Sequence, residues 1–282
     1  MLLAVFAAAC GGGDDSPSPT QPAEVQSVSL SEYLATVLQL ELASFALSAS
    51  PPTTTTEMAA YNWAIAGQYR EAGEVLTRIQ PPPEAAAHAA HYQTLATDAD
   101  RIFSAVAEAW VTGSGADELQ EDLSRITEQS AAAGLELQAL IRVALEQTNS
   151  ALSLYMLASI DLRQQFSTIY GEAITGLQEI LASEDGEAIG AVLREGSAKF
   201  LGFLEPWDAI EPPTEADEAH RLQRDLFTSI SQIFTDLIEP AAVADQDGIQ
   251  AIVGRMAAFN ASVSTTNVAW NQLLIGTLAT AD

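Results

Sequence analysis

A double proline that stops one helix and is followed, one residue later, by Glu-Ala at the start of another occurs twice in this 282-residue chain. The two segments read IQPPPEA at 79–85 and IEPPTEA at 210–216. Because a proline has no backbone N–H and clashes with the preceding turn, a helix must end before each pair. A new helix can begin directly afterwards, with Glu84 or Glu215 near the positive end of its dipole. Each segment therefore predicts a sharp corner between two helices.

The helical patterns that follow the two corners match each other. Four apolar positions recur 131 residues later, which pairs Leu95 with Leu226, Ile102 with Ile233, Phe103 with Phe234 and Val106 with Leu237. The segment around Tyr33 also matches the segment around Tyr155, at a spacing of 122. Apolar positions that repeat with the helical period indicate a duplicated helical unit.

Periodicity and end signals predict eight helices, four in each unit. Ser29 with Glu32 and Thr54 with Glu57 are spaced as capping boxes, and Pro240 is expected to end the seventh helix. No strand pattern competes, and short loops favour antiparallel neighbours. The expected fold class is all-α, with two tandem four-helix up-down bundle units. The helices are expected at about 29–49, 55–79, 83–111, 116–147, 151–181, 187–207, 214–238 and 248–278.

The start of the chain has the form of a secretory signal. An apolar run from Leu2 to Ala9 ends in small residues and is too short to span a bilayer. The segment Ala7-Ala8-Ala9-Cys10 resembles the lipobox of bacterial lipoproteins. This resemblance implies that Cys10, the single cysteine, becomes the lipidated first residue of the mature protein.

The remaining chain divides by composition. Residues 11–26 are rich in Gly, Asp, Ser and Pro and predict a flexible tether. We therefore expect a signal at 1–10, a tether at 11–26, one helical unit at 27–148 and a second at 149–282. The expected location is extracytoplasmic, on the periplasmic or cell-surface face, with the membrane as a partner through the lipid anchor.

The charge balance argues against nucleic acid as a partner. The net charge of −27 arises because only 11 Lys and Arg residues accompany 38 Asp and Glu residues. A nucleic-acid or anionic-membrane surface needs a basic stripe, which this sequence lacks. The 48% apolar content is enough for a sizeable core.

The helix that follows the first corner carries three side chains that form a candidate metal site. Glu84, His88 and His91 lie at i, i+4 and i+7, so they share one helix face. The second unit offers only Asp217 and His220, and the repeat places no histidine opposite another. The alternative is that these are polar residues near a helix start. We expect no metal and no other cofactor.

Two tandem four-helix bundles on an extracytoplasmic anchor resemble imelysin-like proteins, which are associated with iron uptake. The resemblance covers architecture alone, because their His-x-x-Glu pattern is missing here. The residues three positions after His88, His91 and His220 are His91, Thr94 and Gln223. The chain is also similar to helical lipoprotein domains with a Pro-Pro-x-Glu-Ala helix start, and this likeness implies no function.

Two arginines are candidates for ligand binding. Arg125 and Arg255 recur at a spacing of 130 beside apolar positions. The alternative is that each extends to solvent or pairs with a carboxylate. The four tryptophans are expected in the core or at an interface; they are Trp63, Trp110, Trp207 and Trp270.

No nucleophile–base pattern, phosphate loop or Gly-x-Ser-x-Gly segment indicates an enzyme. The sequence favours a non-enzymatic, lipid-anchored helical domain that binds a protein partner or a small ligand. The alternative is a metal- or iron-uptake accessory protein of imelysin-like architecture.

Overall fold

The computed structural model describes residues 25–48, 52, 54–115, 117–181, 186–243 and 246–280. Cys10, the predicted signal and the predicted tether up to residue 24 lie outside these residues. The described part is almost entirely helical, which confirms the all-α fold class. None of its helices is both long enough and apolar enough to cross a membrane. The helices are α1 (Leu30–Ser48), α2 (Thr55–Thr77), α3 (Ala86–Thr112), α4 (Gln120–Thr148), α5 (Ala151–Leu181), α6 (Gly186–Leu201), α7 (Leu204–Asp208), α8 (Asp217–Ala242) and α9 (Gln246–Leu278).

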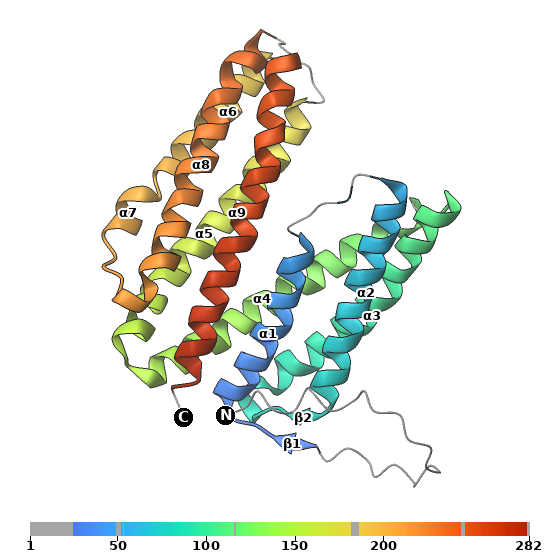
Figure 1. The fold of residues 1–282 in the computed structure, drawn as a ribbon, viewed down its shortest axis with the longest axis vertical. Coiled ribbons are helices and arrows are strands. Elements are labelled where there is room, and N and C mark those ends of the chain that lie inside the picture. The colour runs from blue at the N-terminus through green and yellow to red at the C-terminus, as the bar shows by residue number, and fades with distance from the viewer. Residues whose placement is uncertain are drawn as a thin grey trace, which may run out of the picture.

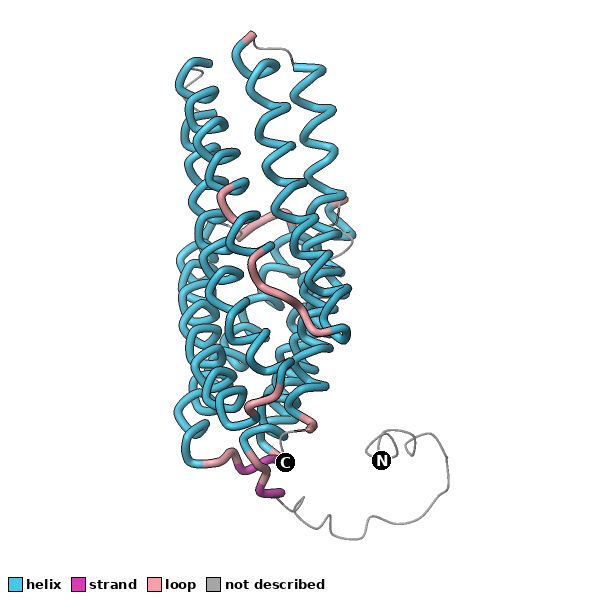
Figure 2. The backbone as a smooth tube through the Cα atoms, turned by 90° about the vertical axis from the view of Figure 1, so that its left-hand side faces the viewer, coloured by secondary structure: helices cyan, strands magenta, loops and turns pink. Residues whose placement is uncertain are grey.

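The long helices form two groups that lie against each other (Figure 1). One group contains α1 to α4, and the other contains α5, α6, α8 and α9. The groups meet where α1 packs along α9 and where α4 leads into α5. After a 90° rotation about the vertical axis, the molecule is seen to be elongated, and most helix axes run nearly parallel to its long axis (Figure 2).

One continuous apolar core spans both groups. It joins Leu34 of α1 and Ile141 of α4 to Met156 of α5, Phe234 of α8 and Leu274 of α9, all at most 3% exposed. A smaller cluster around Ile102 and Ile126 lies between α3 and α4. Because α1 contributes to the same cluster as α9, the cores of the two halves are merged. Of the tryptophans, Trp207 and Trp270 are buried, whereas Trp63 and Trp110 are 50% and 40% exposed.

Both predicted helix corners are present and have the same backbone geometry. Pro82 and Pro213 share a ψ of 158°, and each is followed by a single 3-10 turn. The N–H of Ala85 donates to the Pro82 carbonyl at 3.0 Å, and the N–H of Ala216 donates to the Pro213 carbonyl at 2.8 Å. Both alanines are fully buried. The 3-10 turns are Pro83–Ala85 and Thr214–Ala216, and a third, Asp117–Leu119, precedes α4.

The two capping boxes are confirmed. Glu32 N–H donates to Ser29 Oγ at 3.2 Å, while Glu32 Oε2 accepts from the Ser29 N–H at 2.8 Å. The same reciprocal pair joins Thr54 and Glu57, at 3.2 Å and 2.9 Å. These bonds satisfy N–H groups that have no partner inside the helix.

One predicted helix end and the continuity of one predicted helix are wrong. Pro240 does not stop α8, which continues to Ala242. A proline this close to a helix end removes one hydrogen bond, and the last turn is still closed by the Val243 N–H donating to the Glu239 carbonyl at 3.2 Å. The sixth predicted helix is instead split between α6 and α7, with Gly202 in the break.

The structure also contains a short parallel pairing that the sequence did not predict. Strand β1 (Gln26–Ser27) lies beside β2 (Ile79–Gln80), so Gln26, expected in the tether, is paired with Ile79. The helix α2 ends at Thr77, before the prolines, and its last backbone groups are free to bond elsewhere. They do so with the incoming chain, because the Gln26 N–H donates to the Arg78 carbonyl at 3.1 Å.

Candidate ligand-binding pocket

A pocket of about 530 Å³ lies between α1, α4, α5, α8 and α9, where the two groups of helices meet. Its volume is in the range of sites that hold small organic molecules. Its wall is mixed: somewhat more than half of the lining residues are apolar or aromatic, and most of the others are polar. The apolar lining includes Leu38, Leu137, Ile141, Ile160, Phe166, Tyr170, Leu226, Val263 and Leu274.

The guanidinium of Arg163, on α5, is the one cationic group in the lining of this pocket. It donates to Oε1 of Gln223 on α8 and, at 3.0 Å, to Oδ1 of Asn267 on α9. Its carbon also lies 4.3 Å from the centre of the Trp270 ring, a cation–π contact. A guanidinium has five N–H donors, and these two bonds use two of them.

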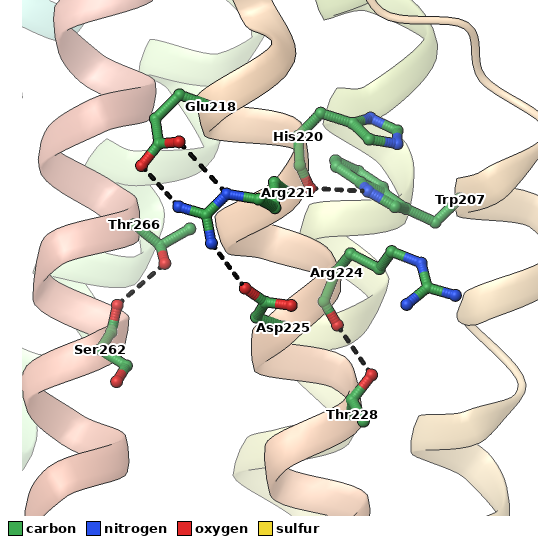
Figure 3. Close-up of polar contacts among 9 residues, drawn as sticks. All are labelled: Trp207, Glu218, His220, Arg221, Arg224, Asp225, Thr228, Ser262 and Thr266. Atoms are coloured by element: carbon green, nitrogen blue, oxygen red, sulfur yellow. Dashed lines mark hydrogen bonds and ion pairs between the residues drawn. The ribbon is translucent and has the colours of Figure 1, made fainter.

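Unlike most of the arginines, Arg163 has no acid beside it. No carboxylate of the described residues lies within 4.0 Å of it. By contrast, Figure 3 shows Arg221 on the surface of α8, held between Glu218 and Asp225 at 2.7 Å and 3.0 Å. Burial lowers the pKa of Arg163 to about 10, so the group stays charged at neutral pH. A partly buried charge without a counter-charge is costly to a fold, and a bound anion would reduce that cost.

Glu41 of α1 lines the same pocket. Its carboxylate accepts a hydrogen bond from Nδ2 of Asn271 on α9 at 3.5 Å. Burial raises the pKa of Glu41 to about 7. A second pocket of about 200 Å³ adjoins the first, since Glu41, Gly134 and Leu137 line both.

The structure does not gather Glu84, His88 and His91 into one site. His88 is 2% exposed, and its Nδ1 lies 2.7 Å from the hydroxyl of Tyr33. His91 is exposed and pairs with Glu136 at 2.8 Å, while Glu84 is exposed. Burial lowers the pKa of His88, which keeps the ring neutral. Within the described ranges, no three His, Cys, Asp or Glu side chains are grouped as a metal ion would require.

A tyrosine–histidine contact recurs in the second group of helices. The hydroxyl of Tyr155 lies 3.3 Å from Nδ1 of His220. Figure 3 shows His220 beside Trp207, whose Nε1 donates to the His220 carbonyl at 3.1 Å. The sequence repeat did not predict this contact, because it aligns His88 with Ala219, one position before His220. Asp217 is exposed beside the corner and is not part of the contact.

The two arginines predicted as ligand-binding residues lie on the surface. Arg125 pairs with Asp122 at 2.6 Å and Arg255 pairs with Asp236, so both have carboxylate partners. Neither lines the pocket around Arg163. Sequence reasoning missed Arg163, although it is a charged residue three positions from each of two buried ones, Ile160 and Phe166. The position of a cation on the apolar face of a helix could have indicated Arg163 as a functional residue.

The chain matches no known protein family, no curated protein and no solved structure. What the protein does is therefore inferred from the side chains themselves.

Proposed function

We propose that this protein is a lipid-anchored, extracytoplasmic binding protein that holds a small organic anion in the pocket between its two groups of helices. The observation that carries the proposal is Arg163, a charged and partly buried side chain of the pocket lining with no carboxylate beside it in the described structure. A carboxylate or similar anion matches the planar, forked donors of a guanidinium.

The surroundings of Arg163 favour an anion with an apolar body. Gln223 and Asn267 fix two guanidinium donors, and Trp270 supports its face, so the group is held in place before a ligand arrives. A preorganised donor loses little conformational freedom on binding. The aliphatic and aromatic lining then contributes by removing apolar ligand surface from water.

The proposal is binding without chemical turnover. The groups that contact Arg163 are two neutral amides and an indole ring, which suit the holding of an anion. Specific, tight retention of a small molecule is what such a set of groups can supply.

The anchoring is proposed from the sequence around Cys10. The described chain begins at β1, which lies at the same end of the molecule as the end of α9 (Figure 1). A lipid on Cys10 would therefore attach the bundle by that end. Replacing Cys10 with Ala should release the protein from membranes into the soluble fraction. Retention of the variant on membranes washed with high salt would contradict a lipid anchor.

We also propose that the two groups of helices are copies of one four-helix unit. The identical ψ angles at Pro82 and Pro213, the two buried alanines after them and the two tyrosine–histidine contacts support this. Their side chains have since diverged, because Phe103 is half-buried beside Tyr69 whereas Phe234 is fully buried. Superposition of 27–148 on 149–282 in an experimental structure tests the duplication.

The binding proposal is tested by calorimetry with 3-phenylpropionate, a carboxylate with an aromatic body. The Arg163→Gln variant should weaken binding by about 10- to 100-fold, the effect of losing a charge-assisted hydrogen bond. Arg194→Gln is the matched control, because it removes the same charge from an exposed arginine of α6. It should bind like the wild type.

A second variant tests the position of the ligand without altering any charge. A side chain at Gly134 would have no atom within 4 Å of its Cβ, and Gly134 lines the pocket. Gly134→Leu should therefore fill part of the pocket and weaken binding while the protein remains folded. If the wild type does not bind the probe, or if Arg163→Gln binds as well as Arg194→Gln, the proposed function is wrong.

A further inference from the structure

A second charged group lies in the same pocket as Arg163, at a spacing set by α9. Arg163 donates to Asn267, and Glu41 accepts from Asn271, at 3.0 Å and 3.5 Å. The two asparagines are four positions apart on one helix, so they occupy consecutive turns of the same face. That separation is about 6 Å along the axis. The lining of the pocket therefore contains a cation and an acid, each hydrogen-bonded to an asparagine of α9.

We propose that the ligand is a zwitterion of the α-amino-acid type, with its carboxylate on Arg163, its ammonium on Glu41 and an apolar side chain in the pocket. This inference rests on the proposed function and adds the second charge. The asparagines suit the two roles, because one offers its oxygen to the cation and the other offers its N–H to the acid.

The side chain of such a ligand has a place to lie. The lining near Arg163 includes Phe166 and Tyr170 of α5 together with Leu226 and Val263. The adjoining pocket adds Tyr69 and Tyr92 beside Glu41, and electron-rich ring faces favour a neighbouring ammonium group. An acid and tyrosine rings at one end, with a guanidinium and an indole at the other, match a molecule that carries both charges.

The protonation of Glu41 predicts how the affinity for each class of ligand depends on pH. In the empty protein the pKa of Glu41 is about 7. An ammonium favours the ionised carboxylate, so an amino acid should bind more tightly as pH rises through this range. A simple carboxylate should show the opposite trend, because ionised Glu41 repels it.

The other groups around Glu41 do not change charge in this range. Burial lowers the pKa of His88 and raises the pKa values of Tyr69 and Tyr92, so all three stay neutral near pH 7. Arg163 stays positive. The neighbouring side chains from α2, α4 and α9 that do not titrate are Gln68, Ser130, Gln138 and Asn271.

The test compares matched probes that differ only in the amine, L-phenylalanine with 3-phenylpropionate and L-leucine with 4-methylpentanoate. Calorimetry at about pH 6 and about pH 8 gives each affinity. With a pKa of about 7, the ionised fraction of Glu41 rises about tenfold between these values, and the affinity for one of the amino acids should rise by up to that factor. At the higher pH that amino acid should bind at least tenfold more tightly than its partner.

The Glu41→Gln variant separates this inference from the proposed function. It should lose both the preference for the amine and the pH dependence, yet still bind the carboxylates through Arg163. If the carboxylates bind as tightly as the amino acids at about pH 8, the ligand is a simple anion and only this inference fails. If neither class binds the wild type, the proposed function fails with it.

Discussion

The hydroxyl of Tyr33 lies 2.7 Å from Nδ1 of His88, and this buried contact joins the start of α1 to the start of α3. Tyr33 is fully buried and His88 is 2% exposed. Burial raises the pKa of Tyr33 and lowers that of His88, so a neutral hydrogen bond holds the two helices together.

Removing this hydroxyl should destabilise the protein. Tyr33→Phe leaves Nδ1 of His88 buried without a partner, which costs about 1–3 kcal/mol. Tyr155→Phe is the comparison, because its contact with His220 is longer, 3.3 Å, and His220 is only partly buried. Urea unfolding should show the larger loss of unfolding free energy for Tyr33→Phe. Equal losses for the two variants would mean that the shorter hydrogen bond does not stabilise the protein more than the longer one.

The pKa of Glu41 predicts how stability depends on pH in the absence of ligand. Its ordinary value is 4.5 and its value in the folded protein is about 7, so the folded state binds more protons than the unfolded state between these values. The contribution of Glu41 to stability is therefore fully present below about pH 4.5, falls as pH rises and is lost above about pH 7, where the ionised carboxylate opposes folding.

Glu41→Gln removes that effect. The variant should be more stable than the wild type at about pH 8, by up to about 3 kcal/mol, and similar to it at about pH 4. Denaturation at both pH values measures the difference. A variant that is less stable at the higher pH would show that the ionised carboxylate stabilises the fold.

Gly196 of α6 is in close contact with the ring of Phe234. A Cβ at position 196 would lie 2.7 Å from two ring carbons, and the ring is buried against Phe200 with their centres 5.2 Å apart. Gly196→Ala should destabilise the protein by about 1–3 kcal/mol through overpacking. Gly171→Ala, on an exposed part of α5 with open space around its Cβ, should instead stabilise by up to about 1 kcal/mol. Thermal unfolding of both variants distinguishes packing from helix propensity.

The two phenylalanines that match in sequence should differ in their effect on stability. Phe234→Ala removes a fully buried ring and should cost about 3–5 kcal/mol. Phe103 is half-buried against Tyr69, so Phe103→Ala should cost about half as much. Because one core joins α1 to α9, both variants should shift a single unfolding transition. Two separate transitions, each sensitive to one variant, would mean that the halves fold independently.

Local features of the fold were predictable because they depend on neighbouring residues. Prolines, capping boxes and apolar periodicity place the helices and both corners from sequence alone. Pro240 misled this prediction, because a proline near a helix end removes only one hydrogen bond. The β1–β2 pairing was missed, because two-residue strands from distant segments have no periodic pattern.

The pocket was harder to predict, since it depends on which helices meet. Arg163 and Glu41 come from different helices, and only their positions beside α9 bring them to one cavity. The repeat instead indicated Arg125 and Arg255, which form ion pairs with carboxylates on the surface. Helical periodicity identifies a cation on an apolar face but does not show whether an acid on another helix neutralises it.

The most direct measurement of the central claim is a crystal structure with 3-(4-bromophenyl)propionate bound, in which the anomalous signal of bromine locates the ligand. If the pocket binds anions, bromine should lie among its apolar lining, with the carboxylate within about 3 Å of the Arg163 guanidinium. Crystals of Arg163→Gln grown with the same compound should lack this signal. Bromine bound at another place in wild-type crystals, with only solvent beside Arg163, would contradict the claim that this pocket is an anion-binding site.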